Sequence, residues 1–336
     1  MHDSQHTRNN NEDKPGLSIN RKAFLKNSAL SMFALSPISK FRLKFNETNP
    51  NLTHGKNGDN DNMLRTIEYN IFNGAIGYKG FNDTKPFPDE SDYQLVSAAR
   101  KLDQIPRRIV SQLQLYKPDI ISFCESATED TIKKMAKWLN MNYAYFPSSK
   151  YKGSYPGTIL THWPIVRSKN RPFAGSPGSI DLFTRHWGKA EIRLPNQELI
   201  TMHSAHLWPF TANGGKAIRL AEIEELLKSI HYDLDHHTKS VILQGDMNLT
   251  PESEEYKKLI EGGLADAFTK VNQGIEFTAT SKDPHVRIDY IFAIGPIAKK
   301  LAKYRSLYEG AFRIHPDDPT SWALSDHIPS LCDFEI

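Results

Sequence analysis

Short apolar segments alternate with amphipathic ones along the chain from Leu64 to Ile336. Apolar runs with period-2 alternation predict strands, and apolar residues three or four positions apart predict helices. The predicted strands cover residues 64–70, 118–125, 143–147, 157–166, 188–195, 198–207, 240–246, 287–294, 301–308 and 328–336. The predicted helices cover residues 93–102, 106–117, 128–139, 216–235 and 251–261. Hairpin-like strand pairs mix with strand–helix–strand crossovers, so the pattern predicts mixed sheets in an α/β sandwich.

The segment Lys216–Asp235 is the strongest helix prediction in the chain. Its apolar face is marked by Leu220, Ile223, Leu227 and Ile230, with Ala217 and Leu226 beside it. An apolar stripe of this kind packs on the core of a globular protein, so we expect this face to be buried.

The first 62 residues follow a different pattern, polar and rich in Asn, with one short apolar stretch at Ala29–Ile38. Arg21 and Lys22 precede that stretch, and a basic region before an apolar one is typical of export signals. The segment resembles a twin-arginine signal in which Lys22 replaces the second arginine. The apolar stretch is too short to span a bilayer.

We therefore expect residues 1–62 to be a disordered segment with an export signal at about 18–40 and an Asn-rich linker. Residues 63–336 are expected to form one folded domain. The expected location is periplasmic or extracellular. The alternative is a disordered tail with a short amphipathic helix on a cytoplasmic protein.

The composition narrows the class of protein but not its chemistry. Apolar residues make up 39% and charged residues 24%, which fits a soluble globular chain rather than a disordered one. The net charge of +3 and the absence of a dense Lys/Arg run disfavour a dedicated nucleic-acid-binding domain. Cys124 and Cys332 lie in apolar runs, so we expect buried free thiols.

Several predicted strands end in a side chain that binds metal ions or transfers protons. At or just after the strand ends these side chains are Asn70, Glu125, His206, Asp246 and Asn248. The late motif "SDHIP" adds Asp326 and His327. Taken singly, each fits an ordinary turn or surface position. Asp289 is different because it lies inside an apolar strand, where a buried carboxylate needs a partner.

The stretch "GDMN" raises a question of geometry. In an extended chain, residues i and i+2 point to the same side, so Asp246 and Asn248 would project together from the strand end. Gly245 would allow another group to approach the backbone closely. The alternative is a turn built from Gly, Asp, Asn and Pro.

Six motifs occur in a fixed order: "YN", "PDIISFCE", "HSAHL", "GDMNLTP", "RIDYIF" and "SDHIP". In this order they resemble the endonuclease/exonuclease/phosphatase family, which includes DNase I-like nucleases, inositol polyphosphate 5-phosphatases and bacterial sphingomyelinases. The resemblance covers roughly residues 63–336. It implies an α/β fold of the DNase I type, a four-layer sandwich of two mixed β-sheets flanked by helices, with the site at one end.

The resemblance also implies roles for the site residues in a metal-dependent phosphoesterase. Mg²⁺ is the expected cofactor, with Mn²⁺ or Ca²⁺ as alternatives, because hard cations prefer oxygen ligands. The implied metal ligands are Glu125, Asn70 and Asp326. Asp246 and Asn248 would orient the attacking water and the phosphate.

The implied proton chemistry involves two histidines whose division of labour stays open. Asp289 would fix the ring of His327, which would act as base or phosphate-stabilising partner. His206 would contact the phosphate and protonate the leaving oxygen. Where the family often has Asn-Thr-His-Leu, this chain has Ser204-Ala205-His206-Leu207.

Arg185 and Trp208 are the expected substrate-binding residues, because a guanidinium suits phosphate and Trp208 closely follows His206. We expect a phosphoester substrate, first of all a small or lipid-linked phosphodiester. A secreted DNase I-like nuclease is the alternative, and a catalytically silent binding domain is a remote one. We expect a monomer without an obligate protein partner or a transmembrane span.

Overall fold

The computed structural model describes residues 62–72, 104–148, 155–170, 182–212, 214–274 and 276–336. The expected export signal and linker and the predicted helix at 93–102 lie outside the described residues. No helix within the described ranges is both long and apolar enough to cross a membrane.

Sheet A contains six strands among the described residues, in the order β11-β12-β1-β2-β4-β3. β1 pairs parallel with β2 and antiparallel with β12, so the sheet is mixed. The strands are β1 (Met63–Asn70), β2 (Ile120–Cys124), β3 (Asn142–Phe146), β4 (Gly157–Thr161), β11 (Leu301–Ser306) and β12 (Ser330–Glu335).

Sheet B also has six described strands, in the order β5-β6-β7-β8-β10-β9. Here β7 and β8 are parallel, and β10 runs antiparallel to β8. The strands are β5 (Ile165–Asn170), β6 (His186–Arg193), β7 (Leu199–His206), β8 (Ser240–Asp246), β9 (Ala265–Asp266) and β10 (Asp289–Ile294).

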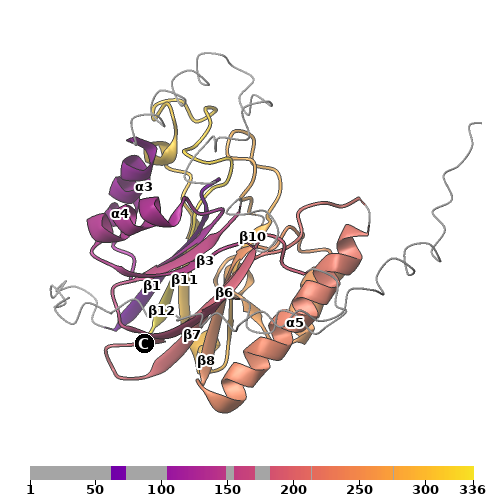
Figure 1. Ribbon diagram of the computed structural model, residues 1–336. Helices are drawn as coiled ribbons and strands as arrows, with labels where there is room; N and C mark the ends of the chain where they lie inside the picture. Colours follow the sequence, from indigo (N-terminus) through magenta and orange to yellow (C-terminus); the bar gives the residue numbers. More distant parts are fainter. Residues whose placement is uncertain (1–61, 73–103, 149–154, 171–181, 213, 275) are drawn as a thin grey trace, which may run out of the picture. The chain divides into compact units, whose positions relative to one another are not determined.

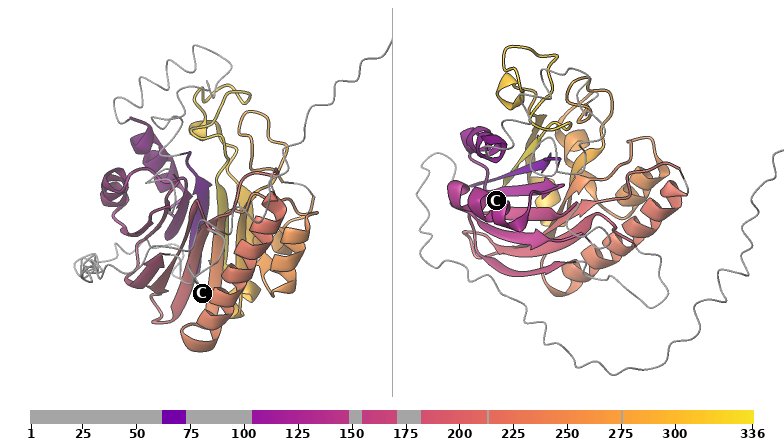
Figure 2. Two further views of the ribbon diagram at one scale, coloured as in Figure 1. Left: turned by 45° about the vertical axis from the view of Figure 1, so that its right-hand side comes forward. Right: turned by 45° about the horizontal axis from the view of Figure 1, so that its top comes forward.

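Helices cover the outer face of each sheet, which gives four layers (Figures 1 and 2). α3 (Gln104–Leu115) and α4 (Glu129–Leu139) pack on sheet A, and α5 (Gly215–His236) and α6 (Glu254–Glu261) pack on sheet B. The short elements are α7 (Ala267–Val271), η1 (Pro296–Lys300) and η2 (Gly310–Phe312). The predicted four-layer sandwich of two mixed sheets is confirmed.

Local sequence explains where the helices begin and end. The side chain of Thr128 accepts a hydrogen bond from the amide of Thr131 at the start of α4, and Asn140 ends the helix in a left-handed conformation. Ser253 caps α6 in the same way, so that helix starts at Glu254 rather than at the predicted Pro251.

The space between the sheets changes from apolar to polar along its length. Leu64, Ile120, Ile242 and Ile291 belong to the apolar cluster between the sheets. Further along the strands, Gln244 Nε2 donates to Thr66 Oγ1 at 2.7 Å, and the hydroxyls of Ser122 and Ser204 lie 2.8 Å apart. These contacts join the two sheets and lead toward the strand ends that carry Asn70, Glu125, His206 and Asp246.

Two sequence predictions are wrong in detail. The predicted strand at 157–166 is two strands, β4 in sheet A and β5 in sheet B. Trp163 turns inward between them, where its amide donates to Thr161 Oγ1, and Pro164 has no amide to continue a ladder. Trp187 is buried as well, and the expected burial of both free thiols is confirmed.

The buried face of α5 is the second difference. Ile223 and Ile230 are buried as predicted, but Leu220 and Leu227 are only half-buried. Leu226 is also buried, and the further positions that reach the interior are Arg219, Glu222, Ser229 and Asp233. Polar side chains can be buried at these positions because each charged one forms a hydrogen bond or ion pair with a buried group.

Candidate active site

Side chains from both sheets meet where several strands end. Asn70 ends β1, Glu125 follows β2, His206 ends β7 and Asp246 ends β8. Because β1 runs parallel to β2 and β7 to β8, these residues lie together at the carboxyl ends of the parallel strands of each sheet. Asp289 begins β10 and is the register partner of Asp246, so it joins the same group.

The carboxylate of Asp246 is the centre of this group. Its Oδ1 accepts the amide of Asn248 at 3.0 Å, and its Oδ2 accepts Asn70 Nδ2 at 3.0 Å. His206 Nε2 lies 3.5 Å and His327 Nε2 lies 3.8 Å from the same Oδ2. Both histidines and Asn70 are therefore arranged around one carboxylate oxygen.

Asp246 and Asn248 reach the site through a turn rather than through an extended strand. Asn248 adopts a left-handed conformation with φ of 49°, and its amide bonds back to Asp246. Its Nδ2 donates to the Leu207 carbonyl at 3.2 Å, which ties the end of β8 to the end of β7. The turn alternative for "GDMN" is the correct description of the backbone.

Gly245 makes this junction of strands possible. Its φ is 148°, and a Cβ at this position would overlap with the backbone carbonyl oxygen of Ala205. The group that approaches the Gly245 backbone is thus the neighbouring strand β7, one residue before His206. A side chain here would push apart the two strands that carry His206 and Asp246.

His327 and Asp289 form a short hydrogen bond. His327 Nδ1 lies 2.8 Å from Asp289 Oδ2, and the carboxylate acceptor fixes the proton on Nδ1. The opposite nitrogen, Nε2, then faces Asp246 at 3.8 Å and Asp326 at 4.0 Å. The amide of Asp289 donates to Thr278 Oγ1, which anchors the acid.

The two histidines have opposite electrostatic surroundings. Burial lowers the pKa of His206, and the positive charge of Arg185 lowers it further, so this ring is neutral. Burial also opposes charge on His327, but the carboxylates of Asp289, Asp326 and Asp246 outweigh it and raise that pKa well above its usual value. His327 is therefore held as a cation.

Glu125 has the properties of a metal-binding carboxylate. It sits at the end of β2 with a φ of 46°, a conformation that is uncommon for non-glycine residues. Burial and the nearby carboxylate of Asp326 raise its pKa to about 8. Two adjacent carboxylates of this kind fit a divalent cation, which prefers oxygen ligands and relieves their repulsion. Asn70 lies beside them, with its amide nitrogen engaged by Asp246.

Glu68 is a member of the site that the sequence did not single out. It is fully buried in β1, and apart from the Cys124 thiol its carboxylate has no hydrogen-bond partner among the described residues. Burial raises its pKa well above the usual value, and the charges of Asp289 and Asp246 raise it further. Glu68 could have been recognised in the sequence by its position two residues before Asn70, which places both side chains on the same face of β1.

The predicted substrate-binding residues lie beside His206. The guanidinium of Arg185 stacks on the ring of Tyr155 at 3.7 Å and lies 5.8 Å from the ring of Phe210. Trp208 is half-buried, and its ring makes an edge contact with Phe210 at 5.4 Å. Both residues therefore belong to one aromatic wall next to the histidine.

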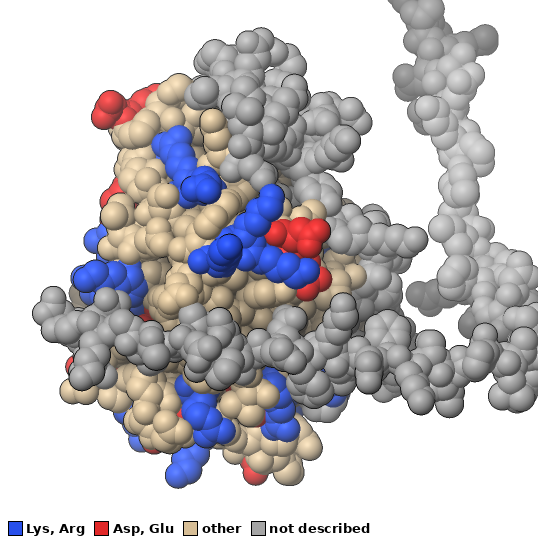
Figure 3. All heavy atoms as spheres, turned by 60° about the vertical axis from the view of Figure 1, so that its left-hand side comes forward, with Lys and Arg blue, Asp and Glu red and all other residues tan. Residues whose placement is uncertain are grey.

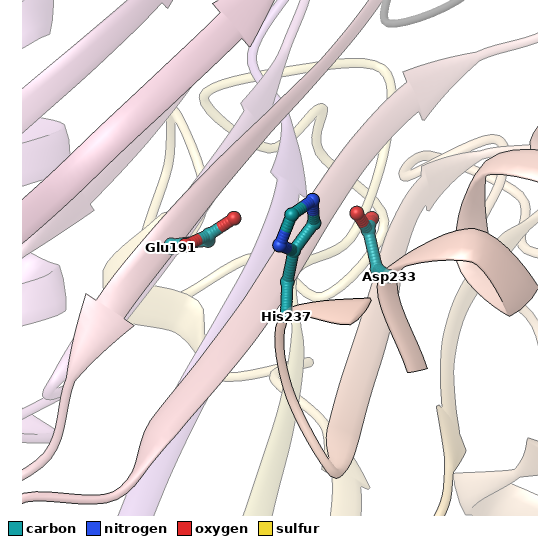
Figure 4. A group of neighbouring side chains, drawn as sticks. All are labelled: Glu191, Asp233 and His237. Carbon is teal, nitrogen blue, oxygen red and sulfur yellow. The ribbon is translucent and has the colours of Figure 1, made fainter. Parts of the chain in front are cut away.

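A second group of metal-ligating side chain types lies under α5, away from these residues. Glu191, Asp233 and His237 present ligand atoms within 4.8 Å of one another, and Figure 4 shows the His237 ring between the two carboxylates. Asp233 already pairs with Lys189 and His203, and Glu191 pairs with Arg167 at 2.5 Å. Because a lysine and an arginine already neutralise both acids, we interpret the group as a buried ion-pair network.

The comparisons with known proteins agree with this geometry. A family model described as the endonuclease/exonuclease/phosphatase family matches residues 69–327. Comparison with curated proteins gave no match.

Solved structures share the fold at low sequence identity. A protein of that family from Bacteroides thetaiotaomicron is 18% identical with a TM-score of 0.61, and the alignment covers 81% of this chain and 97% of that one. A mannosyl-6-phosphatase from the same organism is 16% identical with a TM-score of 0.59, covering 80% and 98%. The human Nocturnin catalytic domain with bound sulfate is 17% identical with a TM-score of 0.57, covering 81% and 94%.

The solved structures thus support the four-layer architecture, whereas the family model is matched by the amino-acid sequence. Its match runs from Tyr69 to His327 and so contains Asn70, Glu125, His206, Asp246 and Asp289 as well. The chain belongs to the endonuclease/exonuclease/phosphatase family.

Proposed function

We propose that this protein is a divalent-metal-dependent phosphodiesterase that hydrolyses a small or lipid-linked phosphodiester by attack of water on phosphorus. The observation that carries the proposal is the arrangement of Asp246 between the His327–Asp289 pair and His206. Phosphoester hydrolysis needs an activated water and positive charge at the phosphoryl oxygens, and this arrangement offers groups for both. Enzymes of this family generally depend on divalent metal ions.

Glu125 and Asp326 would hold the metal ion, with Asn70 beside them. A bound Mg²⁺ or similar ion would neutralise charge on the phosphoryl and leaving oxygens. The raised pKa of Glu125 supports this role, because a buried carboxylate next to a second one is stabilised by a cation.

Asp246 would accept the proton of the attacking water. Its pKa is raised to about 7 by burial and by Asp289, which suits a base that works near neutral pH. Asn248 fixes the Asp246 carboxylate by donating its amide. His327, held positive by Asp289, would stabilise the charge that develops on the phosphate, while the neutral His206 would donate a hydrogen bond to it.

A nuclease has less support from the charge distribution. Binding of a nucleic-acid backbone favours a continuous basic surface. On the face shown in Figure 3, Lys and Arg form separate groups, and acidic residues lie next to the central one. A phosphomonoesterase is a second candidate, because one of the similar structures is a mannosyl-6-phosphatase.

A substrate panel tests the proposal. Purified protein is incubated with bis-p-nitrophenyl phosphate, p-nitrophenyl phosphate, sphingomyelin, inositol phosphates and plasmid DNA, each with Mg²⁺, Mn²⁺, Ca²⁺ or EDTA. We expect diester hydrolysis that EDTA abolishes and a divalent ion restores. Faster cleavage of the monoester would select the second candidate, and a folded protein without turnover on any substrate would contradict the enzyme assignment.

A further inference from the structure

The carboxylate of Glu222 on α5 binds two backbone segments at once. Its side chain is fully buried. Glu222 Oε1 accepts the amide of Phe183 at 2.9 Å, and Oε2 accepts the amide of Trp208 at 2.8 Å. One buried carboxylate thus joins two parts of the chain that are far apart in sequence.

These two segments lie on either side of His206 in the fold. Trp208 follows His206 by two positions, just after the end of β7. Phe183 precedes Arg185 by two positions, and the next residue, His186, is the register partner of His206. The two segments therefore carry both of the predicted substrate-binding residues, Arg185 and Trp208.

The first segment has a backbone conformation that must be held by its surroundings. Phe183 has a φ of 55°, in the left-handed region that is uncommon for residues with a bulky side chain. Conformations of this kind persist where neighbouring contacts fix them. Glu222 fixes the amide of Phe183, and the ring of Trp187 packs on the Phe183 ring with the centroids 4.5 Å apart.

The second segment is held through its carbonyl groups as well. Arg219, three residues before Glu222 on α5, donates to the carbonyls of Trp208 and Phe210, each at 3.1 Å. Its charge is neutralised by Glu255 of α6 at 2.9 Å. Amide and carbonyl groups of one short segment are therefore both bound by side chains of α5.

The surroundings of Glu222 combine two positive charges with an apolar floor. Arg219 acts on it from the same helix, and Arg185 acts on it from the segment before β6. From α6, Glu255 reaches this region through its ion pair with Arg219. The strand β8 contributes apolar side chains to the cluster that it shares with α5.

Protonation of Glu222 weakens the hold on these segments. Burial raises the pKa of this carboxyl to about 7, although the two amides and the two arginines act in the opposite direction. A neutral carboxyl keeps one carbonyl oxygen as acceptor, but its hydroxyl is a donor and accepts an amide poorly. One of the two hydrogen bonds should therefore weaken as the pH falls through about 7.

We propose that Glu222 is a positioning residue of the proposed active site, whose ionised carboxylate holds Arg185 and Trp208 beside His206. It acts through two backbone segments and not by contact with the substrate. The effect on turnover rests on the proposed function, whereas the hold on the segments exists without any substrate.

Fluorine NMR of the full chain labelled with 5-fluorotryptophan tests the hold without turnover. The chain has five tryptophans, and Trp208→Phe identifies the Trp208 resonance. We expect this resonance to shift with a midpoint near pH 7, and Glu222→Gln, which keeps the shape but not the charge, should remove the shift. Since the pKa of Asp246 is also raised to about 7, Asp246→Asn is the control that should keep the shift.

Steady-state kinetics test the consequence for the reaction, with bis-p-nitrophenyl phosphate and Mg²⁺ at about pH 8, where Glu222 is ionised. Glu222→Gln should raise KM about 10-fold, the effect of one hydrogen bond to a charged group. It should leave kcat within about two-fold, because the strands that carry His206 and Asp246 keep their ladder. Lowering the pH to about 6 should raise KM more in the wild-type protein than in Glu222→Gln.

Two further variants separate positioning from general stability. Asp233→Asn also removes a buried charge from α5, one that is bound to Lys189 and His203. It should lower the melting temperature but keep KM and the Trp208 titration. Glu222→Asp retains a carboxylate, so it should keep a titrating Trp208 resonance and have an intermediate KM.

The outcomes distinguish this inference from the proposed function. A Trp208 resonance that does not titrate in the wild-type protein, or that titrates unchanged in Glu222→Gln, overturns the inference. Equal changes of KM in Glu222→Gln and Asp233→Asn overturn it as well. A titration that depends on Glu222, in a protein that hydrolyses no phosphoester, supports the hold on the segments and removes the proposed function.

Discussion

Asp289 and His327 are separated by 38 positions in the sequence and by 2.8 Å in the structure. The carboxylate fixes the ring so that Nε2 faces Asp246, and it favours the charged imidazolium. A single side chain thus sets the direction of its neighbour and, together with Asp326 and Asp246, favours its charge. If this pairing is catalytic, the two residues work as one unit.

Alanine substitutions of the pair should be strongly non-additive in turnover. His327→Ala should cost more than Asp289→Ala, because a misoriented imidazole still contributes some charge. The double variant should then be little slower than His327→Ala alone. Turnover and melting temperature are measured for all three proteins. Multiplicative losses, or an Asp289→Ala protein that unfolds without a specific rate defect, would show that the residues act separately.

Glu125→Gln should lower turnover by about 10²–10³ while the fold is kept, since it removes the charge but not the shape. In the wild-type protein the carboxyl pKa of about 8 means that protons compete with the metal at neutral pH. Metal affinity should therefore fall as the pH decreases from 8 to 6. Metal titrations at pH 6, 7 and 8 measure this, and near-normal turnover of Glu125→Gln would refute the metal assignment.

At the scale of elements, the close contact between β7 and β8 holds His206 and Asp246 together. Gly245→Ala places a methyl group on the Ala205 carbonyl oxygen and should destabilise the protein by about 1–3 kcal/mol or more. Gly274→Ala is the matched control, because Gly274 also has a positive φ, of 99°, but has open space around its Cβ. Thermal unfolding compares the two variants, and equal losses of stability would mean that backbone strain alone matters.

Hydrophobic periodicity was sufficient to predict most strands, the mixed sheets and the existence of α5. It failed where polar side chains are buried in pairs, because a pattern of single residues contains no information on partners. Arg219 reaches the interior through Glu255, and Asp233 through His203 and Lys189. Glu68 was missed for a different reason, since a glutamate in an alternating strand is ordinarily solvent-exposed.

The candidate site was predictable as a set of residues but not as an arrangement. The order of the motifs gave the family, and hence Glu125, Asp246 and His327. The left-handed turn at Asn248 and the stacking of Arg185 on Tyr155 depend on contacts between distant segments. Such contacts have no local signal in the chain.

At the scale of the whole molecule, the site exists only when the two sheets pack. Asn70 and Glu125 come from sheet A, whereas His206, Asp246 and Asp289 come from sheet B. The hydrogen bond from Asn70 to Asp246 joins the two sheets at the site. Neither sheet carries the complete set of groups that the proposed reaction requires.

The N-terminal segment leads to a prediction about location. Arg21 and Lys22 before the stretch Ala29–Ile38 should direct the chain out of the cytoplasm. Cell fractionation should then find mature protein outside the cytosol, shortened by roughly the N-terminal segment. Arg21→Gln with Lys22→Gln is the control that should keep it inside. Full-length protein confined to the cytosol would remove the export prediction and leave the catalytic proposals unaffected.

The strand β5 has a consequence for the behaviour of this protein in concentrated solution. Among the described strands it is the last one of sheet B, and its residues from Val166 to Asn170 are exposed. An open strand edge is a template for pairing with another chain, which leads to fibrous aggregates. Lys169 places a positive charge on this strand, and a lysine on an edge strand disfavours edge-to-edge pairing of two molecules. Colloidal stability thus depends on side chains remote from the proposed catalytic centre.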